Sequence, residues 1–191
     1  AEESGEFKDV PSGAVLTLYY EAKYICITGG ERYYTLNEAL EAIKESGSTE
    51  GTIKMLIPEY AMPADDKLVI LSGYNITITT ASAAEGYEGE GEAQAEAVIK
   101  RSASFTSGHM LENKGTMTLD SIVLDGNNVS AGDAMVLNNS NGTLTVNEGA
   151  ILRNAKGENG GALYVSGGTA VISGTLSENY AANGGAVYVN G

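Results

Sequence analysis

Few side chains in this sequence have the types and spacing that acid–base or metal chemistry requires. The chain holds one histidine, His109, and one cysteine, Cys26. A histidine-based metal site or a Ser–His triad would depend on His109 alone, and a single cysteine forms no disulfide within the chain. His109 follows Gly108 at a turn, so we expect a structural role for it. We expect Cys26 to be a small, buried apolar side chain.

The carboxylates give two further candidates. Asp65 and Asp66 are adjacent in the sequence, and paired carboxylates can act as general acid and base on a glycosidic bond. The sequence around them has no further elements of a glycosidase active site, so we interpret the pair as a solvated turn. Residues 85–96 are rich in glutamate but lack the alternating Asp or Asn ligands of a tight calcium loop. We interpret 83–97 as a solvated acidic loop that projects from one coil, with calcium binding as the open alternative.

Two tyrosines are the candidates for ligand binding. Residues 159–165 (NGGALYV) recur as 183–189 (NGGAVYV), an offset of 24 residues that places Tyr164 and Tyr188 at equivalent positions. Because side chains alternate along a strand, the flanking apolar residues would point into the core and both tyrosines outward. Exposed aromatic rings in a row can stack on sugars. Tyrosine also has high β-propensity and forms ladders with itself, so a purely structural role stays open.

The repeat extends beyond the tyrosines. Residues 115–119 (GTMTL) recur as 142–146 (GTLTV) and more loosely as 168–172 (GTAVI), at offsets of 27 and 26 residues. A period of this length with several short strands suits one coil of a β-helix. We therefore predict an all-β fold, a right-handed parallel β-helix solenoid over about 51–191, with roughly four coils from Val98 onward and about two before. The irregular spacing of Thr and Asn argues against binding of ice or another crystal.

One helix is expected before the coils. Thr35 and Glu38 fit a capping box, and apolar residues follow at helical spacing until Ser46-Gly47, namely Leu36, Ala39, Leu40 and Ile43. An uncovered first coil would recruit other strands, so we expect this helix, 35–45, to cap the solenoid.

Upstream of the helix we expect a small N-terminal β-unit. Two short strands are predicted within Ala14–Thr28, closed by a Gly29-Gly30 turn. The chain is thereby divided into a leader with short strands, 1–33, and the β-helix with its cap, 34–191. Residues 184–191 look like the middle of a repeat, so we expect the β-helix to be truncated at this point.

The charge balance argues against several partners. The chain has 11 basic and 25 acidic side chains, a net charge of −14, which repels nucleic-acid phosphates and anionic lipid headgroups. No stretch reaches the roughly 18 apolar residues that span a bilayer. The acidity is concentrated in residues 1–113, which hold 8 basic and 19 acidic side chains, against 3 and 6 in 114–191.

Several segments together resemble a known family. Residues 33–43 (YYTLNEALEAI), 51–56 (GTIKML) and 75–78 (NITI), followed by Gly-Gly-Ala-x-Tyr-Val coils, resemble the pectin-lyase-like repeat region of large surface proteins and adhesins from gut and other anaerobic bacteria. The resemblance covers about 33–191. It implies an extracellular location at the bacterial cell surface or cell wall, and an adhesin-like role without a defined ligand.

The same fold also hosts pectate lyases and polygalacturonases, so catalysis has to be judged at the site. For a lyase, the resemblance implies a calcium-binding cluster of aspartates on one sheet and an arginine base. Here Asp120, Asp125 and Asp133 fall at different ladder positions, and Arg153 is the only arginine after Arg101. We therefore predict no catalytic residue, no metal site and no cofactor.

The leading functional hypothesis is a non-enzymatic cell-surface adhesin or stalk module. In this hypothesis a rigid β-helix binds a host glycan or surface protein through Tyr164 and Tyr188, and has no nucleic-acid or membrane partner. The alternative is a fragment of a carbohydrate-active enzyme, a polysaccharide lyase or glycoside hydrolase, with active residues on coils outside this sequence.

Overall fold

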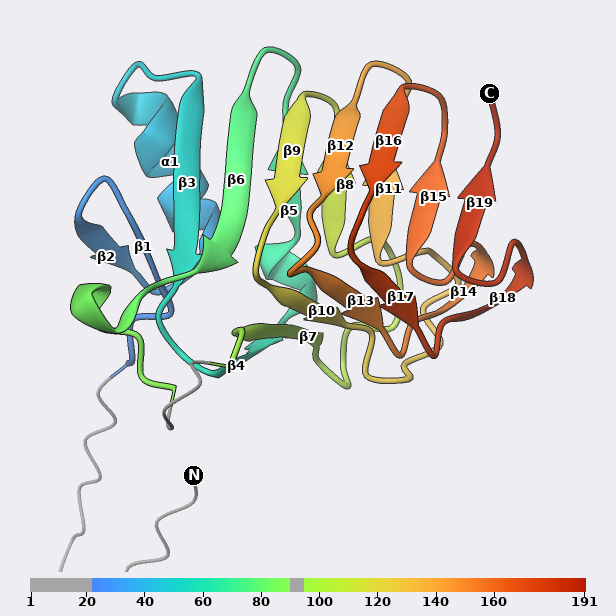
Figure 1. Ribbon diagram of the computed structural model, residues 1–191, viewed down its shortest axis with the longest axis horizontal. Helices are drawn as coiled ribbons and strands as arrows, with labels where there is room; N and C mark the ends of the chain where they lie inside the picture. Colours follow the sequence, from blue (N-terminus) through green and yellow to red (C-terminus); the bar gives the residue numbers. More distant parts are fainter. Residues whose placement is uncertain (1–21, 90–94) are drawn as a thin grey trace, which may run out of the picture.

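The structure is a computed structural model that describes residues 22–89 and 95–191. These residues form a parallel β-helix, as predicted, with one helix at its N-terminal end (Figure 1). Two of the sheets contain five strands each, so the solenoid has five coils rather than the six of the repeat count. The second coil is the longest, since it includes the excursion between β6 and β7.

Three sheets run along the solenoid axis, and each coil contributes one strand to each of them. The first, sheet A, contains the parallel strands β3 (Glu50–Met55), β6 (Asn75–Thr80), β9 (Thr116–Leu119), β12 (Thr143–Val146) and β16 (Thr169–Ile172). Sheet B contains β4 (Glu59–Met62), β7 (Val98–Arg101), β10 (Val123–Asp125), β13 (Ile151–Arg153) and β17 (Thr175–Ser177). Sheet C contains β5 (Leu68–Ile70), β8 (Leu111–Asn113), β11 (Val136–Asn138), β15 (Leu163–Val165) and β19 (Val187–Val189). A fourth, short sheet joins β14 (Lys156–Asn159) to β18 (Tyr180–Asn183).

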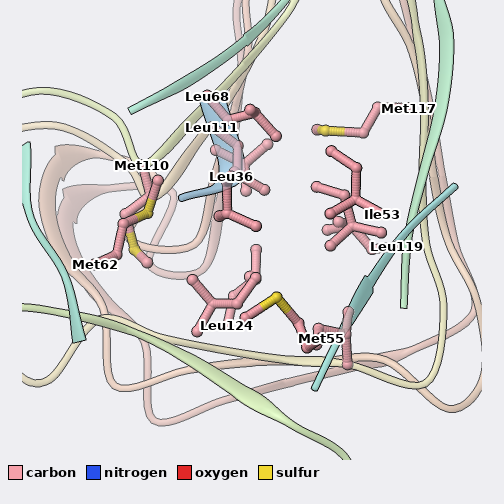
Figure 2. Packing of buried hydrophobic residues seen from close by; sticks show 14 of the residues in the cluster. Leu36, Ile53, Met55, Met62, Leu68, Met110, Leu111, Met117, Leu119 and Leu124 are labelled. Atoms are coloured by element: carbon pink, nitrogen blue, oxygen red, sulfur yellow. The ribbon is translucent and has the colours of Figure 1, made fainter. Parts of the chain in front are cut away.

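Alternation along the strands fills the interior with apolar side chains. Figure 2 shows Ile53, Met117 and Leu119 of sheet A on one side of the core, with Leu68 and Leu111 of sheet C across from them. All five side chains are fully buried. Neighbouring strands lie about 4.8 Å apart, so each coil adds one rung to every ladder.

One polar ladder lies inside this apolar core. Asn113 in β8 and Asn138 in β11 are fully buried and in register. Asn113 Nδ2 donates to Asn138 Oδ1 at 2.8 Å and to the Thr143 carbonyl at 3.0 Å. Asn138 Nδ2 donates to the carbonyls of Gly142 and Thr169, each at 3.1 Å. These bonds satisfy the buried amides and tie sheet C to sheet A between successive coils.

The helix α1 (Leu36–Glu45) covers the first coil, as predicted (Figure 1). The Thr35 hydroxyl accepts from the Glu38 backbone N–H, and the Glu38 carboxylate accepts from the Thr35 N–H, which completes the capping box. Its buried residues are the four that the spacing indicated. The helix approaches β3 so closely that a Cβ at Gly51 would lie 2.4 Å from Ile43 Cδ1, so a larger residue there would displace the Ile43 side chain.

The N-terminal β-unit is a hairpin of β1 (Cys26–Thr28) and β2 (Glu31–Tyr33). The Gly29-Gly30 turn follows the second of the two strands expected within Ala14–Thr28, as predicted, and leads into β2, which was not predicted. The part of that range up to residue 21 lies outside the described residues. Strand β1 also pairs antiparallel with β3, which makes the hairpin an extension of sheet A. Cys26 is fully buried, as expected.

Two short 3₁₀ turns complete the described elements: η1 (Ala64–Asp66), which leads into β5, and η2 (Ala83–Glu85), which follows β6. The last coil differs from the others because no described strand covers it. Val189 occupies the ladder position above Val165 but is 65% exposed, and Ile172, in register with the buried Val146, is 37% exposed. Val189 therefore faces the core side, as predicted, but it is not buried.

Candidate functional site

The two predicted tyrosines form a pair on the outer face of sheet C. Tyr164 and Tyr188 are partners in the β15–β19 register, and their ring centroids lie 5.4 Å apart at an interplanar angle of 56°. The predicted ladder is therefore confirmed, whereas a flat shared platform is not formed. Both rings are half-buried. Asn190 Nδ2 donates to Tyr164 Oη at 3.3 Å.

The column that contains the tyrosines changes character along the axis. Leu137 precedes Tyr164 in register, and Glu112 precedes Leu137. Glu112 forms ion pairs with Lys67 at 3.0 Å and Lys114 at 3.1 Å. Val69 lies on the other side of Glu112, so the continuous apolar part of this column consists of Leu137 and the two rings.

A groove of about 730 Å³ lies at the N-terminal end, where sequence patterns gave no sign of a site. Its lining comes from the β1–β2 hairpin, α1, β3 and the turn after β6, and includes Ile27, Tyr33, Ile43, Thr52, Lys54 and Glu85. Glu31 and Glu50 also line it. Such a lining favours neutral or cationic ligands over anions. Since four separate segments build the groove, no local motif could have predicted it.

The Lys54–Glu85 ion pair lies at the edge of this groove. A hydrogen bond from Lys54 to Glu85, together with hydrogen bonds from Ser82, lowers the pKa of Glu85 to about 2. Glu85 ends η2, at the start of the predicted acidic loop 83–97. Tyr87 in this loop is 7% exposed and donates to the Ala95 carbonyl at 2.8 Å. The described part of the loop is thus anchored to the solenoid; residues 90–94 lie outside the description.

Asp66 is not the solvated turn residue that was predicted. It is 3% exposed, and its carboxylate accepts from the backbone N–H groups of Leu36 and Asn37, each at 3.0 Å. The Asn37 side chain donates at 2.9 Å and the Tyr60 hydroxyl at 2.8 Å. The prediction failed because the partners of Asp66 lie on the helix, about thirty residues earlier. Asp66 thus binds the N-terminus of α1, where backbone N–H groups lack partners within the helix.

Asp66 also influences two neighbouring groups. Burial and the hydrogen bond to Asp66 raise the pKa of Tyr60. Burial, with a smaller contribution from Asp66, raises the pKa of Cys26 to about 12. The thiol is therefore protonated at neutral pH and is a poor nucleophile.

His109 lies in the loop before β8, as a partly buried side chain. Its Nδ1 donates to the Ala134 carbonyl at 2.8 Å, and its Nε2 lies 3.9 Å from Asp133 Oδ1. Burial lowers the pKa of His109, so the ring is neutral at pH 7. Asp133 Oδ2 accepts from the Gly108 N–H at 3.0 Å. These contacts tie two successive coils together.

The remaining aspartates are dispersed, as expected. Asp125 lies on the outer face of sheet B and accepts from Arg153 Nε at 2.8 Å and Asn154 Nδ2 at 3.0 Å. Asp120 follows β9 on sheet A and accepts from Asn147 at 3.0 Å. In the part of the chain that the structure describes, no group of three His, Cys, Asp or Glu side chains could hold a metal ion.

The chain matches no family model, no curated protein and no solved structure. None of the helices within 22–89 and 95–191 is long and apolar enough to cross a membrane. The fold and the surface chemistry therefore carry the functional argument.

A buried arginine was not predicted by any sequence pattern. Arg101, at the end of β7, is fully buried, and its guanidinium lies 5.2 Å from the centre of the Phe105 ring. Nη2 donates to the Gly108 carbonyl at 3.1 Å, but Nε and Nη1 have no hydrogen-bond partner among the described residues. Burial lowers the pKa of Arg101 to about 10. It lies inside the fold, away from any described groove.

Proposed function

We propose that this chain is a non-enzymatic module of an extracellular bacterial surface protein, which presents a rigid β-helix to host glycans or surface proteins. The observation that carries the proposal is the aromatic pair Tyr164–Tyr188 beside Leu137 on the outer face of sheet C. Half-buried tyrosines offer an apolar ring face and a polar tip, which suits wet, amphipathic ligands such as sugars.

The residues with catalytic potential also support a non-enzymatic role. Asp66 binds a helix terminus, Asp125 pairs with Arg153, and His109 donates to a backbone carbonyl. Each of these groups has a partner within the fold, and the aspartates do not converge on one face. Their arrangement favours structural roles over acid–base catalysis.

A rigid scaffold also fits a binding role. The parallel ladders and the buried Asn113–Asn138 bonds hold the coils in one register. A surface held in this way loses little conformational entropy when a ligand binds. The acidic N-terminal part of the chain would at the same time disfavour adsorption to anionic membranes.

The test is a glycan and matrix-protein array with the purified chain and three variants. We expect binding that Tyr164→Ala and Tyr188→Ala each weaken, because a stacked ring contributes about 1 kcal/mol or more to sugar contacts. Tyr180→Ala is the matched control, since Tyr180 is 70% exposed but lies on β18 outside sheet C. Binding that the two variants leave unchanged would overturn the tyrosine site. Turnover of acidic polysaccharide would overturn the non-enzymatic role.

A further inference from the structure

The outer face of sheet A carries two columns of threonine. In register order, one column contains Asn75, Thr116, Thr143 and Thr169, and the other Thr77, Thr118, Thr145 and Val171. We call these eight residues the threonine face. It spans β6, β9, β12 and β16, which lie side by side in Figure 1.

Strand alternation explains why these side chains point outward. Within β9 and β12, the residues between and after the threonines are fully buried: Met117, Leu119, Leu144 and Val146. The threonines are half-buried or exposed. Successive side chains on a strand point to opposite faces, so the buried partners fix the threonines on the surface.

The irregular spacing of Thr and Asn along the chain argued against binding of ice or another crystal. The strand register nevertheless aligns these residues, since Asn75 pairs with Thr116 although a long excursion separates them, and Thr116 pairs with Thr143 after a shorter one. Loops absorb the differences in coil length. The side chains consequently form a regular array in space.

The array has two fixed intervals. Neighbouring strands lie about 4.8 Å apart, and alternate residues along one strand lie roughly 6.6 Å apart. Side-chain ladders of this kind also hold a sheet flat. The threonine face is therefore a two-dimensional lattice with a side chain of similar size at each point, and Val171 matches threonine in its branching.

The chemistry of the face is uniform as well. Among residues 22–89 and 95–191, no hydrogen bond engages the side-chain hydroxyls of Thr77, Thr118 or Thr145. Each hydroxyl can donate one hydrogen bond and accept two, and each threonine also exposes a methyl group. None of the eight residues is charged, although the chain carries −14. Two carboxylates border the face: Glu50 of β3, in register with Asn75, and Asp120, which accepts from Asn147.

We propose that the threonine face binds ice. A regular array adds affinity only for a ligand that repeats on the same scale, and an uncharged, flat face without an aromatic ring offers little to a single sugar chain or a charged polymer. Hydroxyls at fixed intervals can hold waters in a lattice, and methyl groups between them order the waters that surround them. A hydroxyl and a methyl group are both present at every position of the face except Asn75 and Val171.

The test measures thermal hysteresis and inhibition of ice recrystallisation with the purified chain. We expect activity in the wild type and its loss in the double variant Thr118→Tyr, Thr145→Tyr, because two large rings in the middle of the face prevent close contact with a flat lattice. Thr175→Tyr is the control, since Thr175 is an exposed threonine on sheet B, and it should keep full activity. Circular dichroism melts establish that all three proteins are folded.

A second pair of variants separates the two chemical groups. Thr145→Val keeps the methyl group and removes the hydroxyl, whereas Thr145→Ser does the reverse, and each should lower the activity by less than the double variant does. Wild-type protein without effect on ice growth would overturn the proposal, as would a double variant with full activity. Retention on crystalline cellulose or chitin without any effect on ice would also overturn it.

Discussion

At its N-terminal end the solenoid is covered by α1 and extended by the β1–β2 hairpin, whereas at its C-terminal end the last coil leaves Ile172 and Val189 exposed. The covered end depends on individual contacts, above all those of Asp66 with the helix N-terminus. The open end depends on repeated ladders. One end is thus stabilised by unique long-range interactions and the other by nearest-neighbour stacking.

The two ends of the chain also differ in charge. Residues 1–113 hold 19 acidic side chains and residues 114–191 hold 6. The last coil, from 166 to 191, contains a single charged residue, Glu178. Ladders place identical side chains about 4.8 Å apart, where like charges repel. Coils that stack in close register therefore favour Thr, Asn and Tyr over charged residues, and the charges collect where the coils are irregular.

The comparison is tested most strongly by equal truncations at the two ends. Leu40→Ala, in the buried face of α1, should cost about 2–5 kcal/mol of unfolding free energy because it leaves a cavity. Ile172→Ala, at a side chain that is 37% exposed in the last coil, should cost less than about 1 kcal/mol. Urea unfolding gives both values. Equal losses would mean that the last coil is covered in solution, for example by a second copy of the chain.

The next effect concerns the polar contact that holds the cap. Asp66→Ala removes the acceptor for two backbone N–H groups and for Asn37 and Tyr60, and we expect a loss of about 2–3 kcal/mol from these buried donors. Asp65→Ala is the control, since Asp65 is next to Asp66 in the sequence but its own side chain is exposed. Hydrogen exchange should show increased opening of α1 before that of β12. A loss shared equally by both ends would contradict a local role for Asp66.

A smaller effect of opposite sign is expected at Arg101. Replacement of a buried charge by an apolar side chain of similar volume is often neutral or stabilising, so Arg101→Met should raise the unfolding free energy by about 1 kcal/mol. The variant loses the bond to Gly108 and the contact with Phe105 but leaves no unpaired nitrogen. Arg101→Lys is the comparison, because it keeps the charge and should destabilise. Strong destabilisation by Met would instead indicate that bound water satisfies Nε and Nη1.

These two ends also show what the sequence can and cannot predict. The coiled architecture, though not the number of coils, the Tyr164–Tyr188 register and the capping helix were predicted correctly, because a repeat and a capping box are visible in the sequence itself. Asp66 was misinterpreted, since its partners lie on another element. The N-terminal groove was missed for the same reason. The threonine face could not be predicted because coil lengths vary, and only the strand register reveals which residues are neighbours.

The smallest expected effect is the pH dependence of the Lys54–Glu85 pair at the covered end. The hydrogen bond from Lys54, together with those from Ser82, lowers the pKa of Glu85 from 4.5 to about 2. A carboxylate whose pKa is lower in the folded protein contributes stability that is present above its unfolded pKa and is lost as the pH falls through the folded value. The melting temperature of the wild type should therefore fall between pH 4.5 and pH 2 more than that of Lys54→Met.

The difference between these two melting curves should be modest, because solvent screens an ion pair at the surface. Lys44→Met is the control, since it removes the exposed pair with Glu41 on α1 and leaves Glu85 untouched. Parallel curves for the wild type and Lys54→Met would show that Ser82, which also donates to Glu85, lowers the pKa without Lys54. In that case η2 alone would hold Glu85 at the edge of the groove. The Lys54–Glu85 pair would then not contribute to the stability of the covered end.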